Sequence, residues 1–184
     1  MTTTSIVVLV LVLVALAAIA FYLREQRSKR LRSRFGTEYD RVLREYGSRT
    51  KAEEALAHRQ RRVEKIHLRT LAPQEQDQFL ALWRDAQARF VDDPSGAVRE
   101  ADRLVSEVMV ARGYPMSNFE HRVQDLSVVY PQVLRNYRSA HEIALLDEKG
   151  QASTEDRRRA MVFYRDLFDE LIEAPALGAK EVRR

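Results

Sequence analysis

The sequence predicts an all-α protein with an N-terminal transmembrane helix, a charged helical stalk and a compact bundle of about five helices. Three observations predict this class. Residues 6–23 read IVVLVLVLVALAAIAFYL, without a charge, proline or glycine. Elsewhere apolar residues recur at spacings of three and four, which is typical of amphipathic helices. Outside the apolar run, no stretch sustains the period of two that strands need.

The apolar run is long enough to cross a membrane. At the helical rise of about 1.5 Å per residue, roughly 18 residues span about 27 Å, close to a bilayer's hydrocarbon core. Residues 1–5 carry no charged side chain, and Phe21, Tyr22 and Leu23 stand where a secretory signal would have a polar, cleavable region. We therefore expect residues 1–23 to be an uncleaved anchor, with a cleaved signal as the alternative.

A basic segment follows the apolar run directly. Its positive residues are Arg24, Arg27, Lys29, Arg30, Arg32 and Arg34. Lys and Arg are enriched on the cytoplasmic flank of membrane helices, so we expect the N-terminus outside and the rest in the cytoplasm, at the inner membrane. These six residues are the predicted contacts with lipid headgroups, and the bilayer is the first predicted partner.

Charge is unevenly distributed along the chain. The net charge is +4 and the pI is about 9.5. Residues 24–34 hold six basic and one acidic residue, whereas residues 71–184 hold sixteen basic and twenty acidic ones. The basicity therefore belongs to the membrane-proximal part, and we expect no nucleic-acid partner. The absence of cysteine fits a reducing compartment.

Residues 24–70 are predicted to form the basic juxtamembrane segment and the stalk. Thr37, with Asp40 three residues later, is a plausible helix start, and Gly47 is a candidate hinge. Residues 51–66 are rich in Ala, Glu, Arg and Gln, which favour helices, but have few apolar positions. The stalk is too polar for a convincing coiled coil, so we expect it to pair weakly or to lie against the distal domain.

Residues 71–173 are predicted to form the helical bundle domain, and residues 174–184 a flexible tail. Helix starts are marked by residues that cap or open helices: Pro73, Asp93 with Pro94, Ser117 with Glu120, Pro131, and Ser153 or Thr154. Ala72 is a poor cap for the first of these helices. The strongest apolar stripe runs through residues 97–109, and Gly113 and Pro115 end that helix.

The sequence contains no recognisable catalytic, cofactor-binding or metal-binding motif. The four histidines lack metal-ligand spacing, and there is no cysteine or phosphate-binding glycine loop. We therefore predict no catalytic, cofactor-binding or metal-binding residues. His141 lies near an apolar face, and we expect it to be partly buried; Trp83 should lie in the core.

Two loops flank the strongest helix and form a candidate interaction loop through Arg112, Tyr114 and Asp92. An exposed Arg and Tyr would suit protein recognition, since both are enriched at interfaces. We favour the structural interpretation, in which Asp93 caps the strongest helix and Gly113 and Pro115 end it.

Four segments together resemble a known family: RFGTEYDR, QARFVDDPSGAVREADRLVSEVMVARGYP, DLSVVYPQVLRNYRSAHEI and STEDRRRAMVFYRDLFDEL. They are similar to an uncharacterised family of bacterial single-pass membrane proteins with a cytoplasmic all-α domain, over most of residues 34–173. The resemblance implies a bacterial source and supplies no activity. Similar sequences have Ser where this chain has Ala72.

The leading hypothesis is a non-enzymatic, membrane-tethered interaction or scaffold module with an unidentified protein partner; a homo-oligomer stays open. One alternative is a helical domain that binds a small molecule or lipid, with Trp83, Tyr114, Tyr137 and Tyr164 near a pocket. The other is an undescribed enzyme, which would need buried carboxylates converging on His141.

Overall fold

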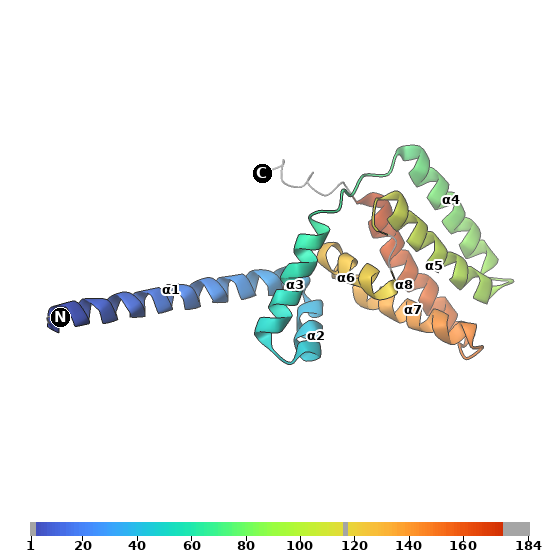
Figure 1. The fold of residues 1–184 in the computed structure, drawn as a ribbon. Helices are drawn as coiled ribbons and strands as arrows, with labels where there is room; N and C mark the ends of the chain where they lie inside the picture. Colours follow the sequence, from blue (N-terminus) through green and yellow to red (C-terminus); the bar gives the residue numbers. More distant parts are fainter. Residues whose placement is uncertain (1–2, 116–117, 175–184) are drawn as a thin grey trace. The chain divides into compact units, whose positions relative to one another are not determined.

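A computed structural model describes residues 3–115 and 118–174, with side chains from residue 8 onward. These residues form eight helices and no strand, which confirms the predicted all-α class (Figure 1). The chain divides into two compact units, Met1–Ala57 and His58–Arg184.

The first unit is organised by α1 (Thr3–Phe35), a continuous helix of 33 residues. Its sequence has neither proline nor glycine, so nothing interrupts its backbone hydrogen bonds. It ends at Gly36, whose φ of 51° is in the left-handed region that glycine enters without strain. The last turns of α1 bury one face, which carries Ser28, Leu31 and Phe35.

Two short helices follow: α2 (Thr37–Tyr46) and α3 (Arg49–Val63), of which the part up to Ala57 belongs to this unit. Gly47, the predicted hinge, ends α2 with a φ of 61° and donates its N–H to the Leu43 carbonyl. Tyr39 and Val42 of α2 are buried, and hydrogen bonds join α1 to α2 and α3. The part of the predicted stalk before residue 58 therefore folds back beside the basic end of α1.

The second unit holds the bundle. Its helices are α4 (Pro73–Arg89), α5 (Pro94–Ala111), α6 (Phe119–Val129), α7 (Leu134–Glu148) and α8 (Thr154–Glu173). Helix α8 contacts α5 and α7, α4 covers α5, and α6 lies beside α7 (Figure 1). Their starts agree with the predicted helix starts to within a few residues.

One apolar core fills the bundle. The α5 stripe predicted at residues 97–109 is buried along its length and faces α8. Trp83 of α4 stacks on Phe168 of α8, with ring centroids 4.6 Å apart and an interplanar angle of 21°. The prediction that Trp83 belongs to the core is confirmed. Such stacking adds about 0.5–1.5 kcal/mol beyond the area that the rings bury.

The bundle helices begin at side-chain caps. The Asp93 carboxylate accepts the Gly96 N–H at 2.8 Å, as predicted. Ser153 and Asp156 form a reciprocal capping box, with the Asp156 N–H donating to the Ser153 hydroxyl at 3.1 Å. The predicted cap at Ser117 and the predicted tail from residue 175 lie outside the described residues; Asn118 accepts the His121 N–H at 3.0 Å.

Ala72 has no side-chain acceptor for the first N–H groups of α4. The start of α4 is instead stabilised by a side chain in its first turn, which accepts the Ala72 N–H. The Glu75 carboxylate accepts the Ala72 N–H at 2.8 Å and pairs with Arg69. The Arg69 guanidinium and then the Ala72 N–H lower the pKa of Glu75 to about 2. This half of a capping box compensates for the weak cap that the sequence indicates.

Candidate functional site

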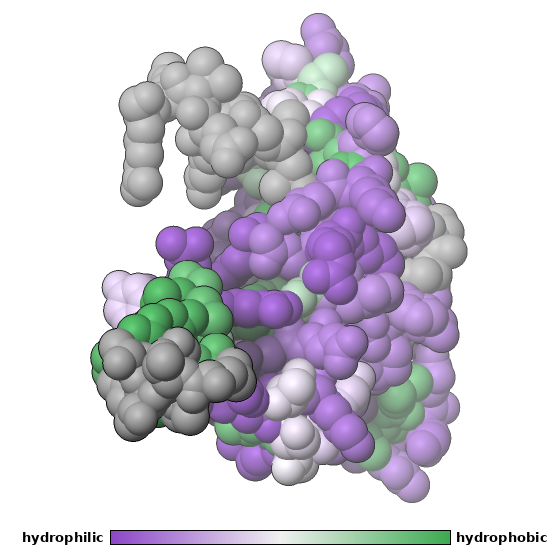
Figure 2. Space-filling view, turned by 60° about the vertical axis from the view of Figure 1, so that its left-hand side comes forward, coloured by the Kyte–Doolittle hydropathy of each residue, from purple (hydrophilic) through white to green (hydrophobic). Residues whose placement is uncertain are grey.

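Between Val8 and Leu23, α1 exposes its apolar side chains on every side. All side chains from Val8 to Leu23 are exposed, among them Leu11 at 64% and Phe21 at 73%. In Figure 2 part of this apolar run is visible as a green patch on α1. Among the described helices, only the one containing Val8–Phe35 is long and apolar enough to cross a membrane, and none of its apolar window is buried.

This exposure separates α1 from an ordinary core helix. Burying one Val, Leu or Ile side chain contributes about 1.5–3 kcal/mol of favourable free energy. In water, the sixteen exposed and mostly apolar positions of α1 do not gain this free energy, whereas in a hydrocarbon environment they do. A helix also satisfies its own backbone groups, which a hydrocarbon environment requires. A candidate membrane span near the N-terminus is therefore confirmed.

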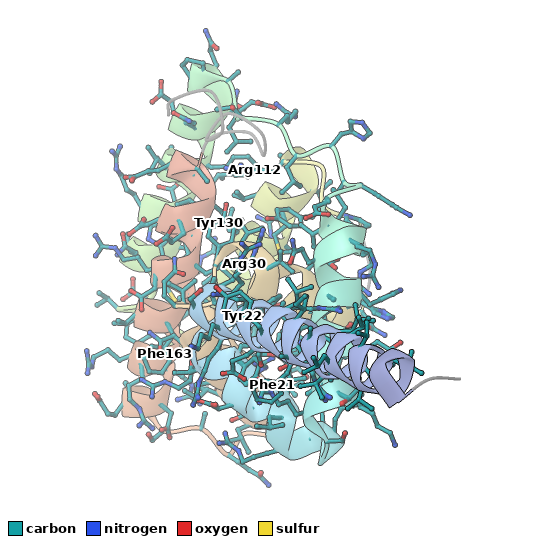
Figure 3. The ribbon with its side chains drawn as sticks, turned by 90° about the vertical axis from the view of Figure 1, so that its left-hand side faces the viewer. Phe21, Tyr22, Arg30, Arg112, Tyr130 and Phe163 are labelled. Carbon is teal, nitrogen blue, oxygen red and sulfur yellow. The ribbon has the colours of Figure 1, made fainter. Side chains whose placement is uncertain are left out.

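The six predicted headgroup residues form what we call the basic collar of α1. All six are exposed: Arg24, Arg27, Lys29, Arg30, Arg32 and Arg34. Figure 3 labels Arg30 on α1, together with Phe21 and Tyr22 at the end of the apolar run.

Two of these residues have partners in their own unit. Arg24 donates to the Thr50 hydroxyl at 2.8 Å, and Arg32 contacts the Asp40 carboxylate at 3.2 Å. The other four form no ion pair among residues 3–115 and 118–174. Their charge is available to an external anion.

Behind the collar lies a buried polar cluster, the Glu53 network, formed by Ser28, Tyr39, Arg49 and Glu53. The Glu53 side chain is only 8% exposed. It accepts hydrogen bonds from the Tyr39 hydroxyl at 2.9 Å, from Arg49 Nε at 3.0 Å and from the Ser28 hydroxyl. The network therefore joins α1, α2 and α3 through one oxygen atom.

The network keeps Glu53 ionised. Burial alone raises the pKa of this carboxyl, but hydrogen bonds from Ser28, Arg49 and Tyr39 outweigh burial and leave the pKa below its usual value. Arg49 also pairs with Glu25 on α1, at 2.9 Å. A buried carboxylate with three donors is satisfied, so it orders the unit rather than destabilising it.

A hollow of about 340 Å³, the α1–α3 pocket, opens beside this network. Its charged lining consists of Glu25, Lys29, Arg32, Asp40 and Arg49. The hydroxyls of Ser28 and Tyr39 add donors, and Leu43 adds an apolar contact. Three basic and two acidic residues thus share one small space. Sequence reasoning found the basic residues of α1 but missed the acidic and hydroxyl groups that the folding of α2 and α3 brings to them.

The bundle changes the interpretation of the candidate interaction loop. Arg112 is 1% exposed and donates to the carbonyls of Leu171 at 2.8 Å and Ala174 at 2.6 Å; Tyr114 is 4% exposed. Figure 3 labels Arg112 near the end of α8. The exposed recognition tip is therefore wrong for these two side chains, because Arg112 satisfies carbonyls that the last turn of α8 leaves without helical donors. Asp92 is exposed, but it precedes α5 whereas Arg112 follows it.

A second polar cluster, the Asp102–His141 cluster, lies between α5, α6, α7 and α8. His141 Nδ1 and Asp102 Oδ1 are 3.9 Å apart, with side chains 21% and 30% exposed. Phe119 stacks on the imidazole at 3.7 Å between ring centroids. The expected partial burial of His141 is confirmed. Sequence reasoning missed Asp102, whose only signal is a carboxylate beside the apolar stripe of α5.

The Asp102–His141 cluster leaves several polar atoms unsatisfied. Within the described part of the chain, Asp102 Oδ1, His141 Nδ1 and the Tyr137 and Tyr164 hydroxyls have no hydrogen-bond partner. Burial raises the pKa of Asp102, but the neighbouring His141 and Tyr164 outweigh it and leave the pKa lowered. At 3.9 Å the His–Asp pair is too long for a direct hydrogen bond, so proton transfer would need a bridging group.

No three His, Asp or Glu side chains gather as a metal site in residues 3–115 and 118–174. Trp83, Tyr114, Tyr137 and Tyr164 do not line the α1–α3 pocket or a second pocket beside α8. The second pocket, beside α8, has an acidic lining that includes Asp166, Asp169 and Glu170.

Together these observations define an all-α protein with one candidate membrane span and a polar pocket beside the basic end of that helix. Comparisons of the chain with protein-family models, with curated proteins and with solved structures find no match. The family resemblance in the sequence therefore stays a prediction.

Proposed function

We propose that this chain is a single-pass protein of the bacterial inner membrane whose helical bundle serves as an interaction scaffold at the cytoplasmic surface. The observation that carries the proposal is α1 itself. Its side chains from Val8 to Leu23 are exposed on every side, and the same unbroken helix continues into the exposed basic collar. Hydrocarbon suits the first part, and anionic headgroups suit the second.

Orientation follows from the collar. Its basic residues flank the C-terminal end of the apolar run, and the residues before the run carry no charged side chain. The excess of Lys and Arg stays on the cytoplasmic side during insertion. The N-terminus is therefore outside, and both α2–α3 and the bundle lie in the cytoplasm.

The chain has no cysteine, so an introduced cysteine is its sole thiol. Thr4→Cys tests the N-terminus, and Gln151→Cys, at an exposed position, tests the bundle. A membrane-impermeant maleimide should label Thr4→Cys in spheroplasts and label Gln151→Cys only after lysis. The reverse pattern overturns the orientation, and release of the wild-type chain by alkaline carbonate overturns the anchor.

The scaffold role is supported by apolar side chains on the bundle surface. Val91, Val110 and Val162 are exposed on or beside three different helices. A photo-crosslinking residue at each position in the full chain, in its native membrane, should join one recurrent protein at one position, with Arg165 as an exposed polar control. Adducts that form equally at all four positions, or at none, contradict a scaffold. Adducts with a second copy identify self-association instead.

A further inference from the structure

We propose that the α1–α3 pocket holds the phosphoethanolamine headgroup of a membrane phospholipid. Lys29 meets the phosphate, and the carboxylates of Glu25 and Asp40 meet the ammonium. The inference rests on the proposed membrane anchoring and adds a specific ligand to the general attraction between the basic collar and anionic lipid.

The depth of the pocket suits a headgroup. Glu25 lies two residues and Arg32 nine residues beyond Leu23, the last residue of the apolar run. At about 1.5 Å per residue, the lining covers roughly 3–14 Å from the end of that run. The polar layer of a bilayer extends about 5–8 Å beyond the hydrocarbon on each side. The part of the pocket nearest the span therefore lies among the headgroups.

The size and composition of the pocket suit a small polar group. Its volume of about 340 Å³ falls at the lower end of ligand-binding clefts, which span about 300–1,000 Å³. Charged and hydroxyl side chains dominate the lining, and Leu43 is its only aliphatic residue. A lipid tail would gain little here, whereas a charged headgroup gains charge-assisted hydrogen bonds.

The charges distinguish between headgroups. Arg49 pairs with Glu25 and Glu53, and Arg32 contacts Asp40. Lys29 forms no ion pair among the described residues, so its ammonium is available to a phosphate. An anionic headgroup would meet Glu25 and Asp40 as like charges. A zwitterionic headgroup with a primary ammonium finds an opposite charge for each of its ends.

Of two neighbouring basic residues on α1, only one lines the pocket. Lys29 lines it, while Arg30, the next residue on α1, does not, although both are exposed. Diffuse attraction to a membrane surface depends on either charge about equally. Binding in the pocket depends on Lys29 alone, so this pair provides a matched test.

The experiment uses the full chain in vesicles of equal parts phosphatidylethanolamine, phosphatidylglycerol and phosphatidylcholine. Native mass spectrometry of the released protein counts the retained lipids. Phosphatidylethanolamine should be retained in preference to both others, because choline's methylated ammonium cannot donate hydrogen bonds to Glu25 or Asp40. Preferential retention of phosphatidylglycerol, or no preference, overturns the proposal.

Lys29→Gln should lower phosphatidylethanolamine retention about tenfold, the equivalent of one charged hydrogen bond. Arg30→Gln should leave it within about twofold, and Asp40→Asn should reduce the preference over phosphatidylcholine. Equal losses in Lys29→Gln and Arg30→Gln mean diffuse electrostatics and overturn the pocket. Circular dichroism of each variant establishes that α1–α3 remain folded.

Two further measurements distinguish a lipid headgroup from free phosphate as the ligand, and failure of the pocket proposal from failure of the membrane anchor. In detergent micelles, soluble glycerophosphoethanolamine should displace the retained lipid, whereas inorganic phosphate at the same concentration should not; displacement by phosphate alone means a free-anion site. If the pocket proposal fails, the labelling of Thr4→Cys and Gln151→Cys is unchanged. If the anchor fails, the wild-type chain leaves the membrane in carbonate.

Discussion

The two units of this protein treat buried polar groups differently. In the first unit, the Glu53 network satisfies a buried carboxylate with three donors from α1, α2 and α3. In the bundle, the Tyr137 and Tyr164 hydroxyls are buried without a partner among the described residues. The bundle has a large apolar core to offset such losses, whereas the first unit buries few apolar side chains. Where apolar area is scarce, polar geometry determines how helices meet.

The largest expected effect comes from a substitution in the apolar core of the bundle. Phe168→Ala should lower the free energy of unfolding of the bundle by about 3–5 kcal/mol, because it opens a cavity beneath Trp83. Phe163→Ala, on the same helix but only half-buried, is the control and should cost clearly less. Urea unfolding followed by tryptophan fluorescence measures both, since Trp83 is the only tryptophan. Equal losses would contradict a core centred on the Trp83–Phe168 stack.

Two tyrosines test the difference between a buried hydroxyl that donates a hydrogen bond and one that has no partner among the described residues. Tyr39→Phe removes a donor from buried Glu53 and should cost about 1–2 kcal/mol in the first unit. Tyr137→Phe removes a hydroxyl without a partner in the described structure and should change stability by less than about 0.5 kcal/mol. Hydrogen–deuterium exchange of α2, α3 and α7 reports each unit separately. A larger loss for Tyr137→Phe would mean that an ordered water completes the Asp102–His141 cluster.

The ionisation of Glu53 makes the stability of the first unit depend on pH. Its pKa is lowered in the folded protein, so its contribution is fully present above the unfolded value of about 4.3 and is lost as pH falls through the folded value. Thermal unfolding from pH 7 to pH 3 should show the advantage of wild type over Glu53→Gln shrinking with acidity. An advantage that stays constant over this range would contradict the hydrogen-bonded carboxylate.

The smallest effect concerns a helix cap. Ala72 has φ −67° and ψ 151°, the extended geometry of a helix cap, and Glu75 already completes half of a capping box. Ala72→Ser should therefore raise stability by about 0.5–1 kcal/mol. Asp93→Ala, which deletes an existing cap, should lower stability by a similar amount. Melting temperatures of the two variants should move in opposite directions.

Local signals predicted most of the fold. Asp93 and Ser153 cap helices because their side chains reach backbone groups only three residues away, and spacing in the sequence contains that information. The stripe of α5 was visible for the same reason. The sequence did not distinguish Glu53 from the other acidic residues of its charged segment, because its partners Ser28 and Tyr39 lie 25 and 14 residues away.

Arg112 illustrates the same limit. Its position before Gly113 fits an exposed helix end as well as a buried one, and only the last turn of α8, about 60 residues later, determines which applies. Asp102 and His141 likewise meet through packing of α5 against α7. Periodicity gives the face of each helix, but not the partner that the face meets.

The continuity of α1 has a mechanical consequence. A helix of 33 residues is about 50 Å long and has no proline or glycine at which to bend. In the proposed membrane setting, a thinner bilayer tilts the apolar half, and Ser28, Leu31 and Phe35 move with it as part of one rod. Bilayer thickness is thereby converted into a rotation of α2 and the first turns of α3.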